Sequence, residues 1–224
     1  MKIDCIADLH GYYPKLEGGD LLIIAGDLTA SDDLIQYEAF FDWLTQQDYQ
    51  KSIIIAGNHD VKLSEGHNPV LKFEDYGMSS VEYLCDSGTE YNGLKIWGSP
   101  WSPYFKNVNP DCMAFMLKDE ALFDKWMMIP KRTDILVTHC PAYGTLDYRE
   151  LEDGTKYHMG SKTLENWIKY VERPLIHAFG HIHECGGMQA EEYATYNDKM
   201  MKSINCSYVN EKYKPVNKQI RIEL

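Results

Sequence analysis

The strongest constraint on the fold is the run Leu-Leu-Ile-Ile-Ala at residues 21–25, which is followed directly by Gly26 and Asp27. Five apolar residues without polar alternation indicate a strand that is buried on both faces, as in sheets covered by helices. Open α/β sheets bind their ligands at the carboxyl ends of such strands. The run therefore predicts an α/β protein in which the Asp27 carboxylate lies at a ligand-binding edge.

The same pattern, a largely apolar strand that ends in polar residues, occurs at four other places. These strands are expected at residues 3–7, 52–56, 135–137 and 175–179. The polar side chains that follow them are Asp8, His10, Asn58, His59, His139, His181 and His183. Together with Asp27, they predict a metal site assembled by a sheet.

The donor types at these positions are carboxylate, amide oxygen and imidazole, and they include no thiolate. This set suits a divalent ion such as Mn²⁺, Fe²⁺ or Zn²⁺. The ligands are too many for one tetrahedral ion and fit two ions that share a bridging carboxylate. Each motif alone is weak, since Gly-Asp is common at strand ends and residues 57–60 also have the composition of an ordinary turn. Their joint occurrence after five strands supports the prediction.

Composition sets the broad class of the protein. At 224 residues the chain can bury a substantial core, and no linker or repeat divides it, so we expect one domain over residues 1–224. The formal net charge of −12 argues against extended nucleic-acid binding, which needs clustered Lys and Arg. The six cysteines form no Cys-x-x-Cys pair, and no apolar run has the length of a membrane span. A cytoplasmic protein without membrane contact is therefore expected.

Periodicity predicts the remaining elements. Apolar spacing indicates a helix over residues 33–47, which would complete a βαβ unit with the strand at 52–56. Short β-type runs at 81–85, 89–91 and 94–97 indicate a second, more antiparallel sheet, with a hairpin turn at Asn92-Gly93. The other expected elements are a helix within 113–128, a polar loop over 141–161, a helix capped by Ser161, and strands at 203–209 and 219–224.

Three further side chains are candidates for substrate contact. His67 lies in the loop region after Asn58 and His59, and Trp101 and Tyr143 follow two of the later strands. An aromatic ring in such a place can stack on a nucleobase. The alternative for the two aromatic residues is ordinary packing beside proline, and the role of Asp60 is left open.

The motifs described above resemble the complete signature of the calcineurin-like metallophosphoesterase superfamily. The resemblance spans most of the chain. It rests on Asp8-x-His10, Gly26-Asp27, Gly57-Asn58-His59-Asp60, His139 and Gly180-His181-x-His183.

Within that superfamily the chain is most similar to the UPF0046 phosphodiesterase branch. The similarity rests on Gly98-Ser99-Pro100-Trp101, His139-x-Pro141, Gly180-His181-Ile182-His183-Glu184 and Tyr213-Lys214-Pro215-Val216-Asn217. Two departures stand beside it. Residues 28–31 lack the Asp-Arg that protein Ser/Thr phosphatases carry after Gly-Asp, and Ala142 stands where the branch would have a second proline.

The resemblance implies an α/β fold with a two-sheet β-sandwich core flanked by helices, and a dinuclear site. One metal ion would be held by Asp8, His10, Asp27 and His183. The other would be held by Asp27, Asn58, His139 and His181, with Asp27 as the bridge. His59 would face the substrate as the catalytic side chain. Mn²⁺ is the first expectation for both ions.

The function expected from this site is hydrolysis of a small phosphoester. Two ions about 3.5–4 Å apart activate a bridging hydroxide for in-line attack on phosphorus. We expect a phosphodiesterase that acts on a small nucleotide or cyclic nucleotide. The alternatives are a phosphomonoesterase or nuclease of the same superfamily, and a metal-binding scaffold without catalysis.

Overall fold

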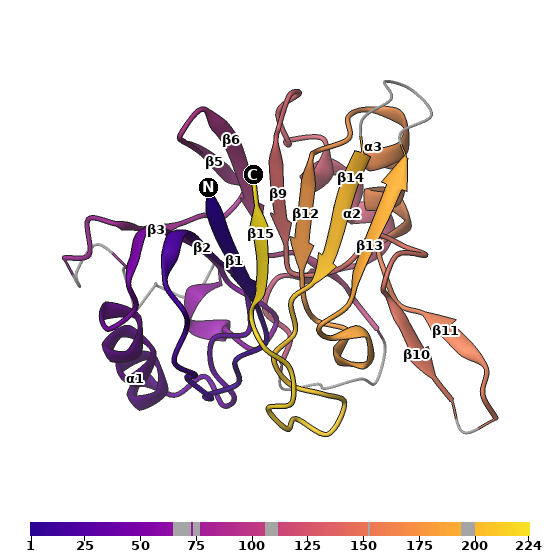
Figure 1. Ribbon diagram of the computed structural model, residues 1–224. Helices are drawn as coiled ribbons and strands as arrows, with labels where there is room; N and C mark the ends of the chain where they lie inside the picture. The colour runs from indigo at the N-terminus through magenta and orange to yellow at the C-terminus, as the bar shows by residue number, and fades with distance from the viewer. Residues whose placement is uncertain (65–72, 74–76, 106–111, 152, 194–199) are drawn as a thin grey trace.

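The computed structural model describes residues 1–64, 73, 77–105, 112–151, 153–193 and 200–224. The strands of this part of the chain form two main sheets that face each other (Figure 1). The first sheet has five strands in the order β15-β1-β2-β3-β4. They are Ile220–Glu223, Lys2–Ile6, Gly19–Ala25, Tyr49–Ile55 and Val81–Tyr83.

The second sheet has six strands in the order β13-β14-β12-β9-β6-β5. They are Gln189–Tyr193, Met200–Asn205, Ile176–Phe179, Ile135–Thr138, Leu94–Ser99 and Ser87–Tyr91. The hairpin between β5 and β6 is confirmed, with Asn92 and Gly93 at φ values of 50° and 79°. Both values are those of the two-residue turns that follow the twist of a hairpin.

The strand pairing corrects the predicted second sheet in two ways. Its central strands β6, β9, β12 and β14 are parallel, and only the edge strands β5 and β13 are antiparallel. Strand β4 belongs to the first sheet instead, where it pairs in parallel with β3. The local sequence indicates that a segment is extended, but the strand with which it pairs depends on contacts between residues far apart in the sequence.

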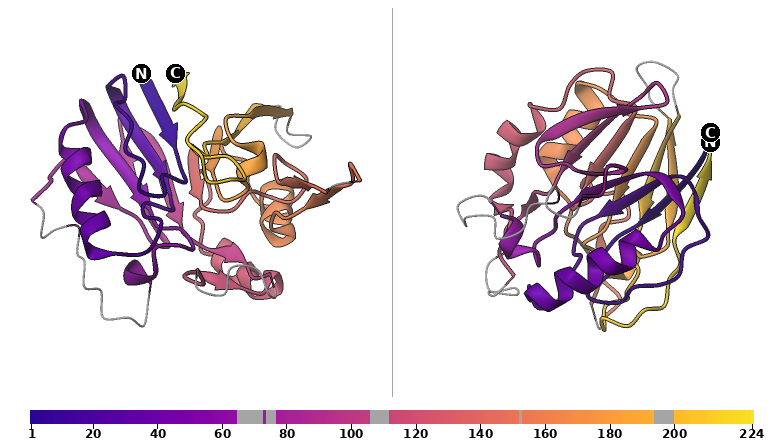
Figure 2. Two further views of the ribbon diagram at one scale, coloured as in Figure 1. Left: turned by 90° about the horizontal axis from the view of Figure 1, so that it is seen from below. Right: turned by 90° about the vertical axis from the view of Figure 1, so that its left-hand side faces the viewer.

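In the part of the chain that the structure describes, three α-helices cover the outer faces of the sheets (Figure 2). They are α1 (Leu34–Thr45), α2 (Asp119–Trp126) and α3 (Lys162–Tyr170). The α1 side chains Tyr37, Phe40 and Phe41 pack on the first sheet, while α2 and α3 pack on the second. A separate apolar cluster, which includes residues of β1, β2, β9 and β12, fills the space between the sheets. This layered architecture confirms the predicted two-sheet sandwich flanked by helices.

Two predicted boundaries change. Helix α2 begins only at Asp119, because Met116–Leu117 form strand β8 and pair with β7 (Ser102–Pro103). The predicted polar loop over 141–161 contains an antiparallel hairpin of β10 (Tyr148–Glu150) and β11 (Lys156–His158). The Ser161 cap is confirmed, since its side-chain oxygen accepts a hydrogen bond from the Leu164 N–H. None of the described helices has the length and apolar character needed to span a membrane.

The topology places polar side chains between the two sheets at one end. Strands β1, β2 and β3 run parallel in the first sheet, and β9 and β12 run parallel in the second. Their carboxyl ends point the same way, as the arrows in Figure 1 show. A parallel bridge between Ala7 and Ser207 and a hydrogen bond from Ala7 N–H to the Cys206 carbonyl (2.9 Å) connect the two halves there. The site described next lies at this junction.

Candidate metal centre

The eight residues predicted as metal ligands or catalytic side chain follow strand ends, and the structure brings these eight together from both sheets. Asp8 and His10 follow β1, Asp27 follows β2, and Asn58 and His59 follow β3. From the second sheet, His139 follows β9, and the pair His181 and His183 follows β12, with His183 opening the short 3₁₀ helix η3 (His183–Cys185). The prediction that one sheet assembles the site is thus corrected, because the site lies across the edges of two.

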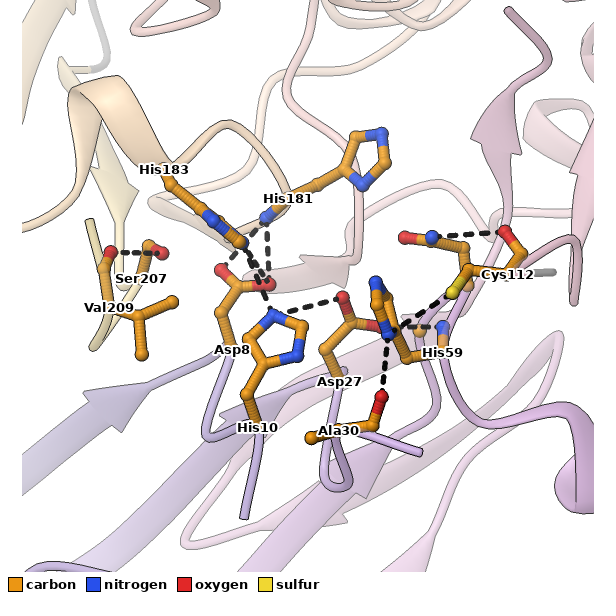
Figure 3. A network of polar contacts seen from close by, with 12 residues as sticks. Asp8, His10, Asp27, Ala30, His59, Cys112, His181, His183, Ser207 and Val209 are labelled. Atoms are coloured by element: carbon orange, nitrogen blue, oxygen red, sulfur yellow. Dashed lines mark hydrogen bonds and ion pairs between the residues drawn. The ribbon is translucent and has the colours of Figure 1, made fainter. Parts of the chain in front are cut away.

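Four of these residues form one tight group, which we call group A: Asp8, His10, Asp27 and His183. One potential ligand atom from each lies within 4.8 Å of the others. The His10 and His183 Nε2 atoms are 3.3 Å apart, and the His10 Nε2 is 3.6 Å from Asp27 Oδ2 (Figure 3). The His183 Nε2 is 3.6 Å from Asp8 Oδ1. Group A therefore presents two carboxylates and two imidazoles to a common centre.

A second set, group B, consists of Asp27, Asn58, His139 and His181. The His139 Nε2 lies 3.4 Å from Asp27 Oδ1 and 3.0 Å from Asn58 Oδ1. The His181 ring lies 4.9 Å from the His139 ring, centre to centre. Asp27 directs its Oδ2 toward group A and its Oδ1 toward group B. Its carboxylate is the side chain that the two groups share.

The chain reaches this arrangement through an unusual backbone. Asp8, His10, Asp27 and His181 have φ values of 52°, 43°, 53° and 69°, in the left-handed region that residues with a Cβ seldom occupy. Residues held there cost of order 1–3 kcal/mol each and persist only where their surroundings fix them. Such strain clusters at functional sites. Here it turns the chain sharply after β1, β2 and β12, so that the side chains point into one centre.

Two glycines allow the close approach of the strand ends. A Cβ at Gly57 would lie 2.2 Å from Asp27 Oδ1, and a Cβ at Gly180 would lie 2.3 Å from Asp8 Oδ2. Neither distance is compatible with a side chain. Both carboxylates therefore occupy space that any residue other than glycine would fill.

We expect Gly180→Ala to lower metal content, because the added methyl group must push Asp8 out of group A. The metal bound per chain would be measured by elemental analysis after incubation with Mn²⁺. Gly77→Ala is the control, because a Cβ there meets nothing within 4 Å, and its φ of 63° adds backbone strain that a substitution at Gly180 does not bring. Equal metal content in the two variants would show that the Gly180 contact does not position Asp8.

The histidines and carboxylates of the site have strongly shifted pKa values. Burial lowers the pKa of His10 to about 4, and burial together with His139 lowers the pKa of His181 to about 3. Burial raises the pKa of Asp27, but nearby histidines, foremost His139, outweigh it and hold that pKa well below its usual range. The Asp27 carboxylate in turn outweighs burial and raises the pKa of His139 to about 9. A metal ion would displace that proton.

The donor set passes a direct test of fit for a divalent metal ion. Buried carboxylate oxygens and imidazole nitrogens converge here, and this is unfavourable unless a proton or a cation lies between them. The Nδ1 atom of His10 is buried without a hydrogen-bond partner among the described residues, while its Nε2 faces His183 and Asp27. Oxygen and imidazole nitrogen are the ligands of Mn²⁺, Fe²⁺ and Zn²⁺ in proteins. Group A, whose ligand atoms lie within 4.8 Å of one another, could hold such an ion.

His59 is adjacent to Asn58 but lies differently. Its backbone N–H donates to Asp27 Oδ1 (2.9 Å), while its Nδ1 lies 3.2 Å from the Ala30 carbonyl oxygen and 3.4 Å from Cys112 Sγ. Burial lowers the pKa of His59, but Asp27 and Cys112 outweigh it and raise the pKa to about 10. Its ring lies 4.6 Å from the His10 ring and lines a cavity of about 520 Å³.

Asp60, whose role the sequence left open, organises the loops beneath the site. Its fully buried carboxylate accepts hydrogen bonds from the backbone N–H groups of Gly57 (2.8 Å), Leu28 (3.1 Å) and Thr29 (3.3 Å). These bonds join the loop after β2 to the loop after β3. Burial and the nearby Asp27 raise the pKa of Asp60 to about 7. Asp60 thereby sets the relative positions of Asp27 and Asn58.

Of the three predicted substrate contacts, the structure describes two and places neither beside the metal ligands. Trp101 donates its indole N–H to Asp86 Oδ2 (2.8 Å), and Lys125 Nζ lies over its ring at 4.1 Å. Tyr143 lies beside His158 at 5.3 Å, centre to centre. Neither ring is among the described residues that line the cavity. His67 lies outside the described residues.

Sequence reasoning missed several residues that the structure places in the cavity wall. Arg149 and Glu150 come from β10, Glu184 from η3, and Glu211 and Tyr213 from the chain between β14 and β15. Glu184 and Tyr213 appear in the sequence analysis only as members of family motifs. Those motifs were the available signals, because Arg149, Glu150 and Glu211 are ordinary surface residue types.

Comparison with known proteins agrees with this picture. The chain is 33% identical to metallophosphoesterase domain-containing protein 1 of Homo sapiens over 98% of this chain and 70% of that protein. It is 30% identical to the UPF0046 protein C25E10.12 of Caenorhabditis elegans over 88% of this chain and 73% of that protein.

Solved structures share the fold at low sequence identity. One, 13% identical, superposes with a TM-score of 0.68 over 94% of this chain and 91% of the other. TT1561 of Thermus thermophilus, 16% identical, gives a TM-score of 0.57 over 92% and 90%. The sequence model of the calcineurin-like phosphoesterases matches residues 1–185, which contain both ligand groups. The chain therefore belongs to the calcineurin-like phosphoesterase family, whose members are metal-dependent hydrolases of phosphoester bonds.

Proposed function

We propose that this protein is a dinuclear phosphodiesterase that hydrolyses a small nucleotide or cyclic-nucleotide diester, with residues 1–224 forming one catalytic domain. The observation that supports the dinuclear site best is the position of Asp27. Its Oδ2 lies 3.6 Å from His10 Nε2, and its Oδ1 lies 3.4 Å from His139 Nε2. A carboxylate that offers one oxygen to each of two ligand groups is suited to bridge two ions.

In this proposal the two groups hold one divalent ion each, with Mn²⁺ as the expected metal. Asp8, His10, Asp27 and His183 are the ligands of group A, and Asn58, His139 and His181 join Asp27 in group B. Such ions would supply an activated water as the nucleophile and would neutralise charge on the phosphoryl oxygens. The protein residues fix where this happens. Asp60 and the strained turns after β1, β2 and β12 hold the ligands in place.

His59 is the proposed catalytic side chain. Its Nδ1 lies 3.2 Å from the Ala30 carbonyl oxygen, and this contact assigns the Nδ1 proton and leaves Nε2 for the substrate. From the cavity wall the ring can donate a hydrogen bond to a phosphoryl oxygen or a proton to the leaving alkoxide. The hydrogen bond from its backbone to Asp27 keeps the ring next to the reacting group.

The charges around the cavity support a diester as the substrate. Its described wall includes three glutamates, Glu150, Glu184 and Glu211, and one arginine, Arg149. The Arg149 Nε also lies 3.5 Å from Glu184 Oε1, so part of its charge is compensated. A phosphomonoester carries a second negative charge, which is gripped best by paired arginines. A diester, which carries a single negative charge, is repelled less by these glutamates.

We expect the Mn²⁺-loaded protein to hydrolyse bis-p-nitrophenyl phosphate with a higher kcat/KM than p-nitrophenyl phosphate. Cyclic nucleotides and a short oligonucleotide extend the same panel, and EDTA should abolish every activity until Mn²⁺ is restored. Release of p-nitrophenolate, followed by its absorbance, measures the first pair directly. A preference for the monoester would overturn the diesterase proposal and favour a phosphatase. Efficient cleavage of the oligonucleotide alone would favour a nuclease, and no hydrolysis of any ester would favour a scaffold.

A further inference from the structure

One aromatic ring over the site comes from a part of the chain that lies outside the family match. Tyr213 belongs to the connection between β14 and β15, beyond residue 185. The centre of its ring lies 4.9 Å from the His10 ring, 5.0 Å from the His183 ring and 6.1 Å from the His59 ring. The side chain is 38% exposed and lines the cavity. It is therefore close both to group A and to the proposed catalytic histidine.

The loop around Tyr213 is built to hold this ring in place. Asn210 Oδ1 accepts hydrogen bonds from the backbone N–H groups of Lys212 and Lys214, both at 3.0 Å. The Tyr213 N–H donates to the Asn210 carbonyl (2.8 Å), and the Asn210 N–H donates to the Lys214 carbonyl (2.9 Å). Tyr213 itself has a φ of 54°, which a tyrosine seldom adopts. Four local hydrogen bonds thus maintain a strained turn whose tip is the aromatic residue.

The end of the loop is also fixed against the segment that carries His183. The Asn217 side chain donates to the Ser207 carbonyl (2.9 Å), and its backbone N–H donates to the Tyr208 carbonyl (3.1 Å). A Cβ at Gly186, directly after η3, would lie 2.5 Å from Asn217 Nδ2. The absence of a side chain at Gly186 lets the loop approach η3 this closely. These contacts fix the position of Tyr213 relative to His183.

We propose that Tyr213 contacts the substrate and holds an aromatic or nucleobase arm of the phosphodiester in the cavity. This inference rests on the proposed diesterase function and assigns the arm-binding surface of that site. A partly exposed tyrosine beside the ligand histidines offers an apolar face at the place where an ester arm leaves the phosphorus. Stacking of a base on an aromatic side chain contributes roughly 1–3 kcal/mol. Trp101, the ring first expected in this role, is instead engaged with Asp86 and Lys125.

The test compares two diesters that share a leaving group, bis-p-nitrophenyl phosphate and methyl p-nitrophenyl phosphate. They differ only in the retained arm, which is aromatic in the first and a methyl group in the second. In Tyr213→Ala we expect kcat/KM for the aromatic diester to fall about tenfold more than for the methyl diester, mainly through KM. Tyr213→Phe should keep most of the wild-type preference. Tyr170→Ala, at a tyrosine on α3 that is 76% exposed, is the control and should behave as wild type.

An equal loss on both diesters, or no loss on either, would overturn the inference. So would a fall in bound Mn²⁺ in Tyr213→Ala, because the ring would then support His10 and His183 rather than the substrate. A binding measurement separates this inference from the proposed function. Calorimetric titration with diphenylphosphinate and dimethylphosphinate, which carry one negative charge as a diester does and cannot be hydrolysed, should show a preference for the phenyl compound that Tyr213→Ala removes. Hydrolysis of neither diester by the wild-type protein would refute the diesterase, and the titration would still decide the role of Tyr213.

Discussion

Asp27→Asn is expected to lose bound metal from both groups and to reduce kcat/KM by about 10³-fold or more. The carboxylate is nearly fully buried and is the side chain that faces His10 on one side and His139 on the other. An amide keeps the shape but replaces one oxygen with a nitrogen that cannot bind a cation. Losing several kcal/mol of charge stabilisation corresponds to a loss of this size, since about 1.4 kcal/mol is tenfold.

Elemental analysis of the purified variant measures its metal content, and the rate of hydrolysis of bis-p-nitrophenyl phosphate measures its activity. Asp42→Asn, at an exposed aspartate on α1, is the matched control and should retain metal and activity. If Asp27→Asn kept two ions per chain and its activity, Asp27 would not be the bridge. Loss of one ion only would place Asp27 in a single group.

His59→Ala is expected to keep its metal while kcat falls by about 10²–10⁴-fold, the range typical of general acid–base groups. Its side chain lines the cavity, and its Nδ1 lies against the Ala30 carbonyl and Cys112 rather than toward group A. Removing the ring should therefore leave the ligands in place. The measurement pairs metal content with kcat on one diester.

His158→Ala provides the histidine control, because His158 lies on the β10–β11 hairpin and binds Asp147 (2.6 Å). It should retain both metal and turnover. A fall in metal content in His59→Ala would mean that His59 is a ligand and not the catalytic side chain. An unchanged kcat would remove it from the mechanism altogether.

The strand ends could be predicted because two simple signals coincide there. Unbroken apolar runs such as residues 21–25 mark strands buried on both faces, and parallel strands end at a common edge. Donor residues directly after such runs must lie near one another. The same local logic gave the Asn92-Gly93 turn and the Ser161 cap, where a few adjacent residues determine the conformation.

The features that escaped prediction depend on partners far away in the sequence. Strand β4 joins the first sheet through β3, and Trp101 is engaged by Asp86 and Lys125. The β10 and β11 strands carry polar, largely exposed side chains, so their sequence lacks the apolar alternation of a half-buried strand. Tyr213 lies 30 residues beyond His183 in the sequence, and its contact with the His183 ring cannot be predicted from hydrophobic periodicity or residue spacing.

The most direct test of the dinuclear site is the position of Mn²⁺ in crystals of the protein, located from its anomalous X-ray scattering. Two peaks are expected about 3.5–4 Å apart, one among Asp8, His10 and His183 and the other among Asn58, His139 and His181. Asp27 should lie between them with one oxygen toward each. A single peak, or peaks away from Asp27, would contradict the dinuclear site from which the proposed chemistry follows.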